Sequence, residues 1–149
     1  MMMAIMSMMG SNAQARRAQF NRESILSATP ARLLTMLYDR LLLDLNRAQA
    51  AQLNQDWQVA SDNLLHAQAI VSELSSSLNV EAWDGAEGLF AIYVYVQNAL
   101  MSSNVHRDVN RTVECIGLLE PLRQTWHEAA EQLPAQPMGA RIGGELGYA

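Results

Sequence analysis

The sequence predicts an all-α protein folded as an antiparallel, up-and-down four-helix bundle, with a short additional helix at the N-terminus as an option. Apolar residues make up 50% of the 149-residue chain, whereas only 6% of its residues are aromatic. Four long segments repeat apolar residues at intervals of three or four, the period of an amphipathic helix. The connections between these segments are short and polar, which favours antiparallel neighbours in a bundle.

The first helix is expected over about residues 30–54. Thr29 is suited to the N-cap position, and Pro30 to the first helical position, where no intrahelical donor is needed. Residues 54–56 supply turn and capping chemistry at the far end. Between Leu33 and Leu45, apolar residues cover more of the circumference than one core-facing stripe requires. This surplus leaves three interpretations open: a groove for a partner helix, an oligomer interface, or a deeper core.

The second helix is expected over about residues 56–78. Its apolar residues step by three and four along one side, as in a bundle seam: Trp57, Ala60, Leu64, Ala67, Val71, Leu74 and Leu78. The third helix is expected to begin between Asp84 and Glu87 and to end near Ser102 and Ser103. Its β-branched and aromatic residues make a strand the alternative, but its length and spacing favour a helix.

The fourth helix is expected from about residue 106 or 108 to residue 131, with Pro121 inside it as a candidate kink. We expect a mobile segment over residues 1–19, the bundle domain over 20–131, and a disordered tail rich in Gly and Pro over 132–149. The methionine-rich beginning has no basic region and no long apolar run, so neither a signal peptide nor a membrane span is predicted. The single cysteine, Cys115, is expected to be buried, in a cytoplasmic protein.

The charge and motif content favour a binding protein over an enzyme. The chain has a formal net charge of −5, which argues against nucleic acid as a partner. It contains no Glu-x-x-His pair, no Cys-x-x-Cys, no His-Glu-x-x-His and no glycine-rich phosphate loop. We therefore expect no catalytic residues, no cofactor and no metal.

Two groups of polar residues have alternative interpretations. A helical bundle can present one histidine for phosphotransfer, and His66 is the candidate, although Asp62 one turn earlier would repel phosphate. Asp39, Asp44 and the neighbouring arginines Arg40 and Arg47 are expected to form a solvated charged face. A structural homodimer that buries the apolar surplus against itself is the third interpretation of the chain.

The sequence resembles the flagellin-specific secretion chaperone family, FliS, over about residues 20–130. The most specific part is Ala28-Thr29-Pro30 followed at a fixed spacing by Met36-Leu37-Tyr38-Asp39. Further matching positions are Phe20, Ile25, Leu34, Asp56, Ala67, Ile70, Glu73, Leu74, Leu78, Tyr93, Tyr95, Asn104, Asp108, Leu119, Arg123 and Trp126. Phe20 stands where the family commonly has Tyr, so a hydrogen bond from that phenol would be lost.

The resemblance implies a cytoplasmic chaperone that binds the disordered C-terminal segment of flagellin in apolar grooves. It would prevent premature polymerisation and deliver flagellin to the flagellar type III export apparatus, without a cofactor, nucleic acid or membrane insertion. A homo-oligomer is an option when no client is bound. We place the flagellin-binding surface at Ile25, Leu26, Leu34, Leu37 and Tyr38, bordered by Leu64, Val71, Tyr93, Val96 and Leu100. Which of these line a groove and which form the core is left open.

Overall fold

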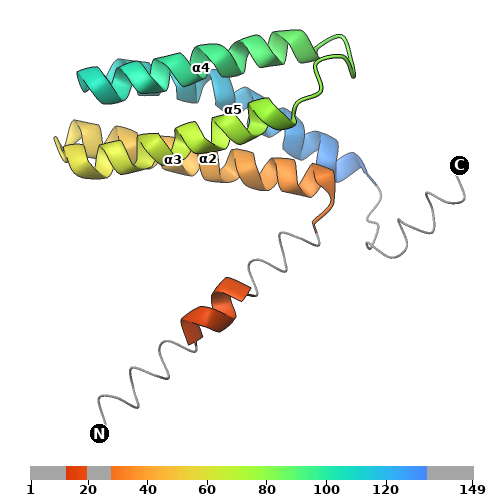
Figure 1. The fold of residues 1–149 in the computed structure, drawn as a ribbon, viewed down its shortest axis with the longest axis horizontal. Coiled ribbons are helices and arrows are strands. Elements are labelled where there is room, and N and C mark those ends of the chain that lie inside the picture. Colours follow the sequence, from red (N-terminus) through yellow and green to blue (C-terminus); the bar gives the residue numbers. More distant parts are fainter. Residues whose placement is uncertain (1–12, 20–27, 134–149) are drawn as a thin grey trace, which may run out of the picture. The chain divides into compact units, whose positions relative to one another are not determined.

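The computed structural model describes residues 13–19 and 28–133, and every regular element in these two ranges is a helix (Figure 1). Residues 13–19 form a short helical segment. The four long helices are α2 (Pro30–Leu53), α3 (Trp57–Ser77), α4 (Ala86–His106) and α5 (Val109–Gln132). Within the compact unit Leu34–Gln132, successive helices run in opposite directions. The predicted all-α class is confirmed, while the expectations for residues 1–12 and 134–149 lie outside the described residues.

Local capping chemistry sets where the first two long helices begin. The hydroxyl of Thr29 accepts a hydrogen bond from the backbone N–H of Arg32 at 3.1 Å, so Thr29 is the N-cap of α2 as predicted. The carboxylate of Asp56 accepts from the backbone N–H of Val59 at 3.4 Å and caps α3. Both helix starts therefore depend on side chains whose roles were readable from the sequence.

The end of α4 differs from the prediction. The helix continues through Ser102 and Ser103 to His106, and Arg107 ends it in the left-handed conformation with φ 53°. The reason is tertiary: Ser103 is buried and its hydroxyl donates to the carbonyl of Asp108 at 2.7 Å. A serine that looks like a helix stop is thus held inside the helix by partners beyond it.

Helix α5 continues through Pro121, which lies inside it. Proline has no backbone N–H, so the carbonyl of Gly117, four residues earlier, loses its usual helical donor. Both residues are exposed, so water can serve that carbonyl instead. The exposed position explains how the helix accommodates a proline.

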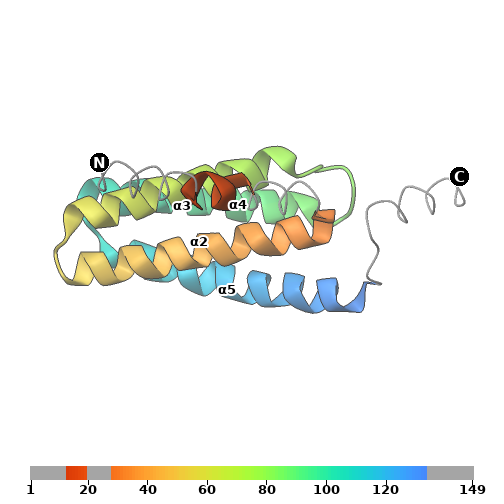
Figure 2. The same cartoon turned by 90° about the horizontal axis from the view of Figure 1, so that it is seen from below.

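The core runs along the centre of the bundle. Helix α3 packs against α4, and α4 against α5, while α2 lies beside α5 (Figure 2). The largest fully buried apolar side chains come from all four helices: Tyr38, Leu41, Leu45, Leu64, Val71, Tyr93, Val96, Leu100, Cys115 and Leu119. Burial of Cys115 confirms its predicted place. Among the described helices, none combines the length and apolar character that crossing a lipid bilayer requires.

Polar side chains connect α2 to its neighbours. The Gln52 amide donates to the hydroxyl of Ser103 on α4 at 2.9 Å and accepts from the hydroxyl of Thr112 on α5 at 2.8 Å. All three side chains are buried, and Ser103 and Thr112 are also 2.7 Å apart. This network joins three helices at the end of the bundle where α2 leads into α3.

Candidate functional site

Most of the residues predicted to contact flagellin lie in the core. The fully buried members of that set are Tyr38, Leu64, Val71, Tyr93, Val96 and Leu100. Placing them at the border of an exposed groove does not fit this structure, because their side chains have no accessible surface to offer a partner. In this bundle they hold the helices to one another.

The remaining four predicted contacts lie on or before α2. Leu34 and Leu37 are partly buried and pack against the core cluster. Each leaves part of its side chain at the surface, so both stay candidates for contact with a partner. Ile25 and Leu26 lie outside the described residues.

Tyr38 shows why part of the specific sequence block is structural. Its hydroxyl is 2.6 Å from the hydroxyl of Tyr93, and its ring centroid lies 6.4 Å from that of Trp126. Burial raises the pKa of Tyr38 against the opposing effect of its bond with Tyr93. Burial also raises the pKa of Tyr93, and there the bond with Tyr38 acts in the same direction. The two neutral phenols thus connect α2 with α4 inside the core.

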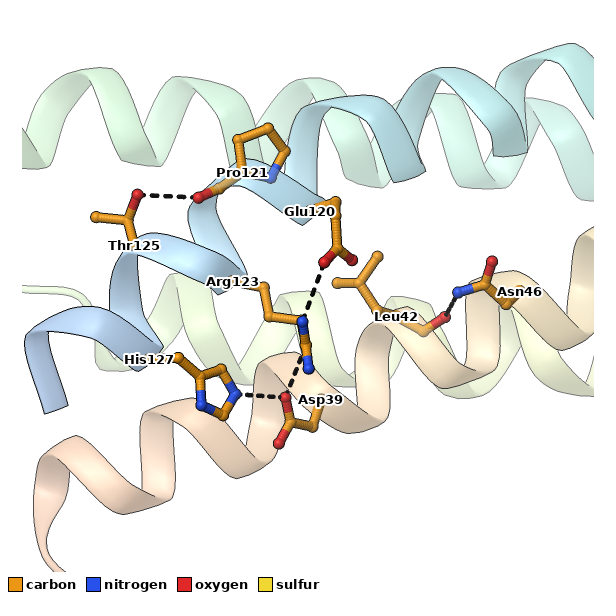
Figure 3. Close-up of polar contacts among 8 residues, drawn as sticks. All are labelled: Asp39, Leu42, Asn46, Glu120, Pro121, Arg123, Thr125 and His127. Carbon is orange, nitrogen blue, oxygen red and sulfur yellow. Dashed lines mark hydrogen bonds and ion pairs between the residues drawn. The ribbon is translucent and has the colours of Figure 1, made fainter. Parts of the chain in front are cut away.

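Asp39, the next residue of the same block, binds α5 (Figure 3). Its carboxylate accepts from Arg123 at 2.8 Å and contacts His127 at 2.6 Å, while Arg123 also pairs with Glu120 at 3.0 Å. Partial burial opposes ionisation, but the hydrogen bonds and charges of His127 and Arg123 outweigh it and lower the pKa of the Asp39 carboxyl. Asp39 therefore belongs to a polar bridge between α2 and α5.

Asp44 corrects the expectation of a solvated charged face. Its side chain is 0% exposed, pairs with Arg40 at 3.0 Å and contacts the imidazole of His66 on α3. A buried carboxylate is stable only when it is paired and hydrogen-bonded, and the half-exposed side chains of Arg40 and His66 supply the partners. Asp44 thus links α2 with α3.

His66, the candidate phosphotransfer histidine, takes part in this contact with Asp44. The side chain of His66 is half-exposed, but its Nδ1 faces the carboxylate of Asp44. Asp62 lies one turn earlier on the same helix. Two carboxylates beside the imidazole would repel an incoming phosphoryl group, so the geometry does not favour this alternative.

An exposed apolar face lies along α3 and α4. Its large members are Leu65 on α3 and Phe90, Val94, Met101 and Val105 on α4. The four α4 residues fall on one side of the helix at intervals of four, seven and four. The Gln97 amide donates to the carbonyl of Gln68 at 3.1 Å, which fixes the pairing of the two antiparallel helices. By this pairing, Leu65 and Met101 lie at about the same level.

We call these five residues the α3–α4 face. Helical periodicity in the sequence did not single out these five positions as one exposed surface. The interval of four, seven and four was visible in the sequence, and the structure exposes these four α4 residues while it buries Tyr93 and Leu100. No group of His, Cys, Asp and Glu suited to hold a metal occurs within residues 13–19 and 28–133.

The fold and the α3–α4 face define a helical-bundle protein with a surface suited to bind a partner segment. The family model for FliS, described as Flagellar protein FliS, matches residues 12–133. The chain therefore belongs to the FliS family.

Two relatives carry the description Flagellar secretion chaperone FliS. The Bacillus subtilis (strain 168) protein is 30% identical over 112 residues, covering 75% of this chain and 84% of the relative. The Escherichia coli (strain K12) protein is 31% identical over 115 residues, covering 75% and 85%. A solved structure described as a flagellar chaperone from bacteria matches with a TM-score of 0.64 at 19% identity, covering 82% of this chain and 99% of the other. The structural likeness supports the fold.

Proposed function

We propose that this protein is a non-enzymatic cytoplasmic chaperone that binds the disordered C-terminal segment of flagellin. It prevents premature polymerisation and delivers flagellin to the flagellar type III export apparatus. The observation that carries the proposal is membership of the FliS family over residues 12–133, together with two relatives described as flagellar secretion chaperones. The α3–α4 face supplies a physical means of binding.

The α3–α4 face suits a client that folds as it binds. Its apolar side chains on α4 offer area to an amphipathic helix, which gains free energy by burying its own apolar side. On α3 the neighbouring exposed residues Ala69, Ser72 and Ser76 are small, so a client backbone can approach closely. The client loses chain entropy on ordering, and the area buried must exceed that cost. Leu34 and Leu37 are further proposed contacts on α2.

The test uses the full chain and a peptide with the flagellin C-terminal sequence. We expect one-to-one binding by calorimetry, a gain of helicity in the circular dichroism of the mixture, and a negative heat-capacity change. Absence of binding at micromolar protein would contradict the proposal. Sedimentation at several concentrations without peptide reports whether the empty protein self-associates.

A matched pair of variants locates the binding surface. Val94 on the α3–α4 face and Val113 on α5 are the same residue type and are both 45% exposed. Val94→Asp places a charge in the proposed interface and should weaken peptide binding about tenfold or more, because burying an unpaired charge is costly. Val113→Asp makes the same change elsewhere and should leave the affinity unchanged. Equal effects of the two substitutions would exclude the α3–α4 face as the binding surface.

A further inference from the structure

A small cavity lies at the end of the bundle where α2 leads into α3 and α4 leads into α5. Its volume is about 250 Å³, and its lining includes Gln52, Trp57, Ser61, Leu64, Asn104 and Arg107. Pockets for drug-sized ligands span roughly 300–1,000 Å³. This cavity therefore has the size for a single side chain, a chain end or a very small molecule.

Arg107 supplies the positive charge of the cavity. Its guanidinium lies 4.9 Å from the centroid of the Trp57 ring, a cation–π arrangement that leaves the N–H edge of the guanidinium free to bind an anion. No carboxylate among the described residues forms an ion pair with it. Its backbone is left-handed, a conformation that favours glycine or asparagine, yet an arginine stands there. Arg107 is exposed, so this position presents a cation that lies against an aromatic ring and forms no ion pair within the described residues.

A buried donor lines the same cavity. Gln52 is 4% exposed, and its amide nitrogen donates one hydrogen to Ser103. Its amide oxygen accepts from the hydroxyl of Thr112 at 2.8 Å. The second amide N–H has no acceptor among the residues that the structure describes. A buried N–H without an acceptor is unfavourable, so a ligand that accepts from it gains free energy.

The rest of the lining also favours an anion with an apolar stem. The side chains of Ser61 and Asn104 make no hydrogen bond within the described part of the chain, while Leu64 and Ala60 supply apolar surface. No Asp or Glu lines the cavity. The nearby carboxylates Asp56 and Asp108 accept from backbone N–H groups of Val59 and Asn110.

We propose that this cavity binds one carboxylate carried on a short apolar stem. Arg107 pairs with the carboxylate, Gln52 and Asn104 donate hydrogen bonds to it, and Leu64 contacts the stem. One cation matches the single charge of a carboxylate, whereas a phosphate dianion would leave net charge buried beside Leu64. The carboxylate comes either from a peptide chain end or from a small free acid.

The probes are N-acetyl-Ala-Leu with a free carboxyl terminus, the same dipeptide as its carboxamide, propionate, and inorganic phosphate. Each is titrated into the full chain, and the indole N–H signal of Trp57 is followed by NMR. We expect the free-acid dipeptide to shift this signal saturably. The carboxamide should bind at least about tenfold more weakly, because a charge-assisted hydrogen bond is lost. Binding should weaken in high salt.

The variants separate the cavity from general charge effects. Arg107→Asn places at this position a residue that tolerates the left-handed backbone, and it should lower the affinity for the free-acid dipeptide at least about tenfold. Arg47→Asn removes the same charge from an exposed position of α2 outside the cavity and should leave binding unchanged. Gln52→Met tests the buried donor, with a circular dichroism melt to show that the bundle is still folded.

Each outcome bears on the proposal. Tighter binding of the dipeptide than of propionate supports a peptide chain end, and equal binding supports a small free acid. Equal binding of acid and carboxamide overturns the proposal, as does an unchanged affinity in Arg107→Asn. Stronger binding of phosphate than of either carboxylate, or no saturable shift with any probe, also overturns it.

Discussion

The buried pair of Tyr38 and Tyr93 gives a sharp test of whether these residues belong to the core. The three variants are Tyr38→Phe, Tyr93→Phe and the double substitution. Each single change removes one hydroxyl and leaves the other buried without its partner at 2.6 Å. The double change removes both hydroxyls and keeps the shape of both rings.

The expected magnitudes follow from this asymmetry. Leaving one buried hydroxyl unpaired costs about 1–3 kcal/mol, whereas replacing both partners by apolar groups of the same shape is nearly neutral. For a domain of this size, each kcal/mol corresponds to roughly 4 °C in the melting temperature. Each single variant should therefore melt several degrees below the double variant.

The assay is urea unfolding followed by circular dichroism, with the free energies of the three variants combined in a double-mutant cycle. The m-value should stay constant, which shows that the surface exposed on unfolding is unchanged. Binding of the flagellin peptide should also stay constant, because neither phenol is accessible. Destabilisation of the double variant by the sum of the two single effects would refute the reasoning.

Two further predictions concern other buried groups. Arg40→Ala combined with His66→Ala leaves the Asp44 carboxylate buried without these partners and should cost about 3–5 kcal/mol in urea unfolding, clearly more than either single change; a double variant as stable as the natural chain would show that Asp44 is solvated. Burial raises the pKa of the Cys115 thiol from 9.0 to about 12, so the folded protein should react slowly with a thiol reagent at pH 8 and the urea-unfolded protein quickly. Rapid reaction of the folded protein at pH 8 would contradict the burial of this thiol. Because the folded pKa is raised, the contribution of this thiol to stability is full below pH 9 and declines towards pH 12.

The features that the sequence predicted best depend on residues close together in the chain. The starts of α2 and α3 follow from Thr29 and Asp56, which bond to backbone N–H groups three residues later. The end of α4 was misplaced because Ser103 is held by Asp108 and Thr112, contacts that only the folded chain brings together. Local pattern and tertiary contact thus disagree where a polar residue is buried.

The candidate site was harder to predict for a related reason. Tyr93 and Val94 are adjacent apolar residues of the third predicted helix. Which of them faces the other helices depends on how α4 is rotated about its axis in the bundle. The structure buries Tyr93 and exposes Val94. Asp44 looked like half of a surface ion pair with Arg40, because its contact with His66 spans 22 residues of sequence. Composition identifies an apolar surplus, and packing decides where it is exposed.

The polar groups that α2 directs at its neighbours also determine how far that helix can slide along the bundle. The leucines of α2 recur every few residues, so apolar packing alone would tolerate a shift by one turn. Such a shift, about 5.4 Å, would carry Asp44 away from His66, and Gln52 away from Ser103 and Thr112. Asp44 would keep Arg40, which lies on the same helix, but the buried carboxylate would lose His66, and Gln52 would be buried without either of its partners. The slipped arrangement is therefore disfavoured by the cost of these lost contacts. Hydrogen bonds inside the bundle therefore select one register, and with it the side chains that α2 leaves on the outside.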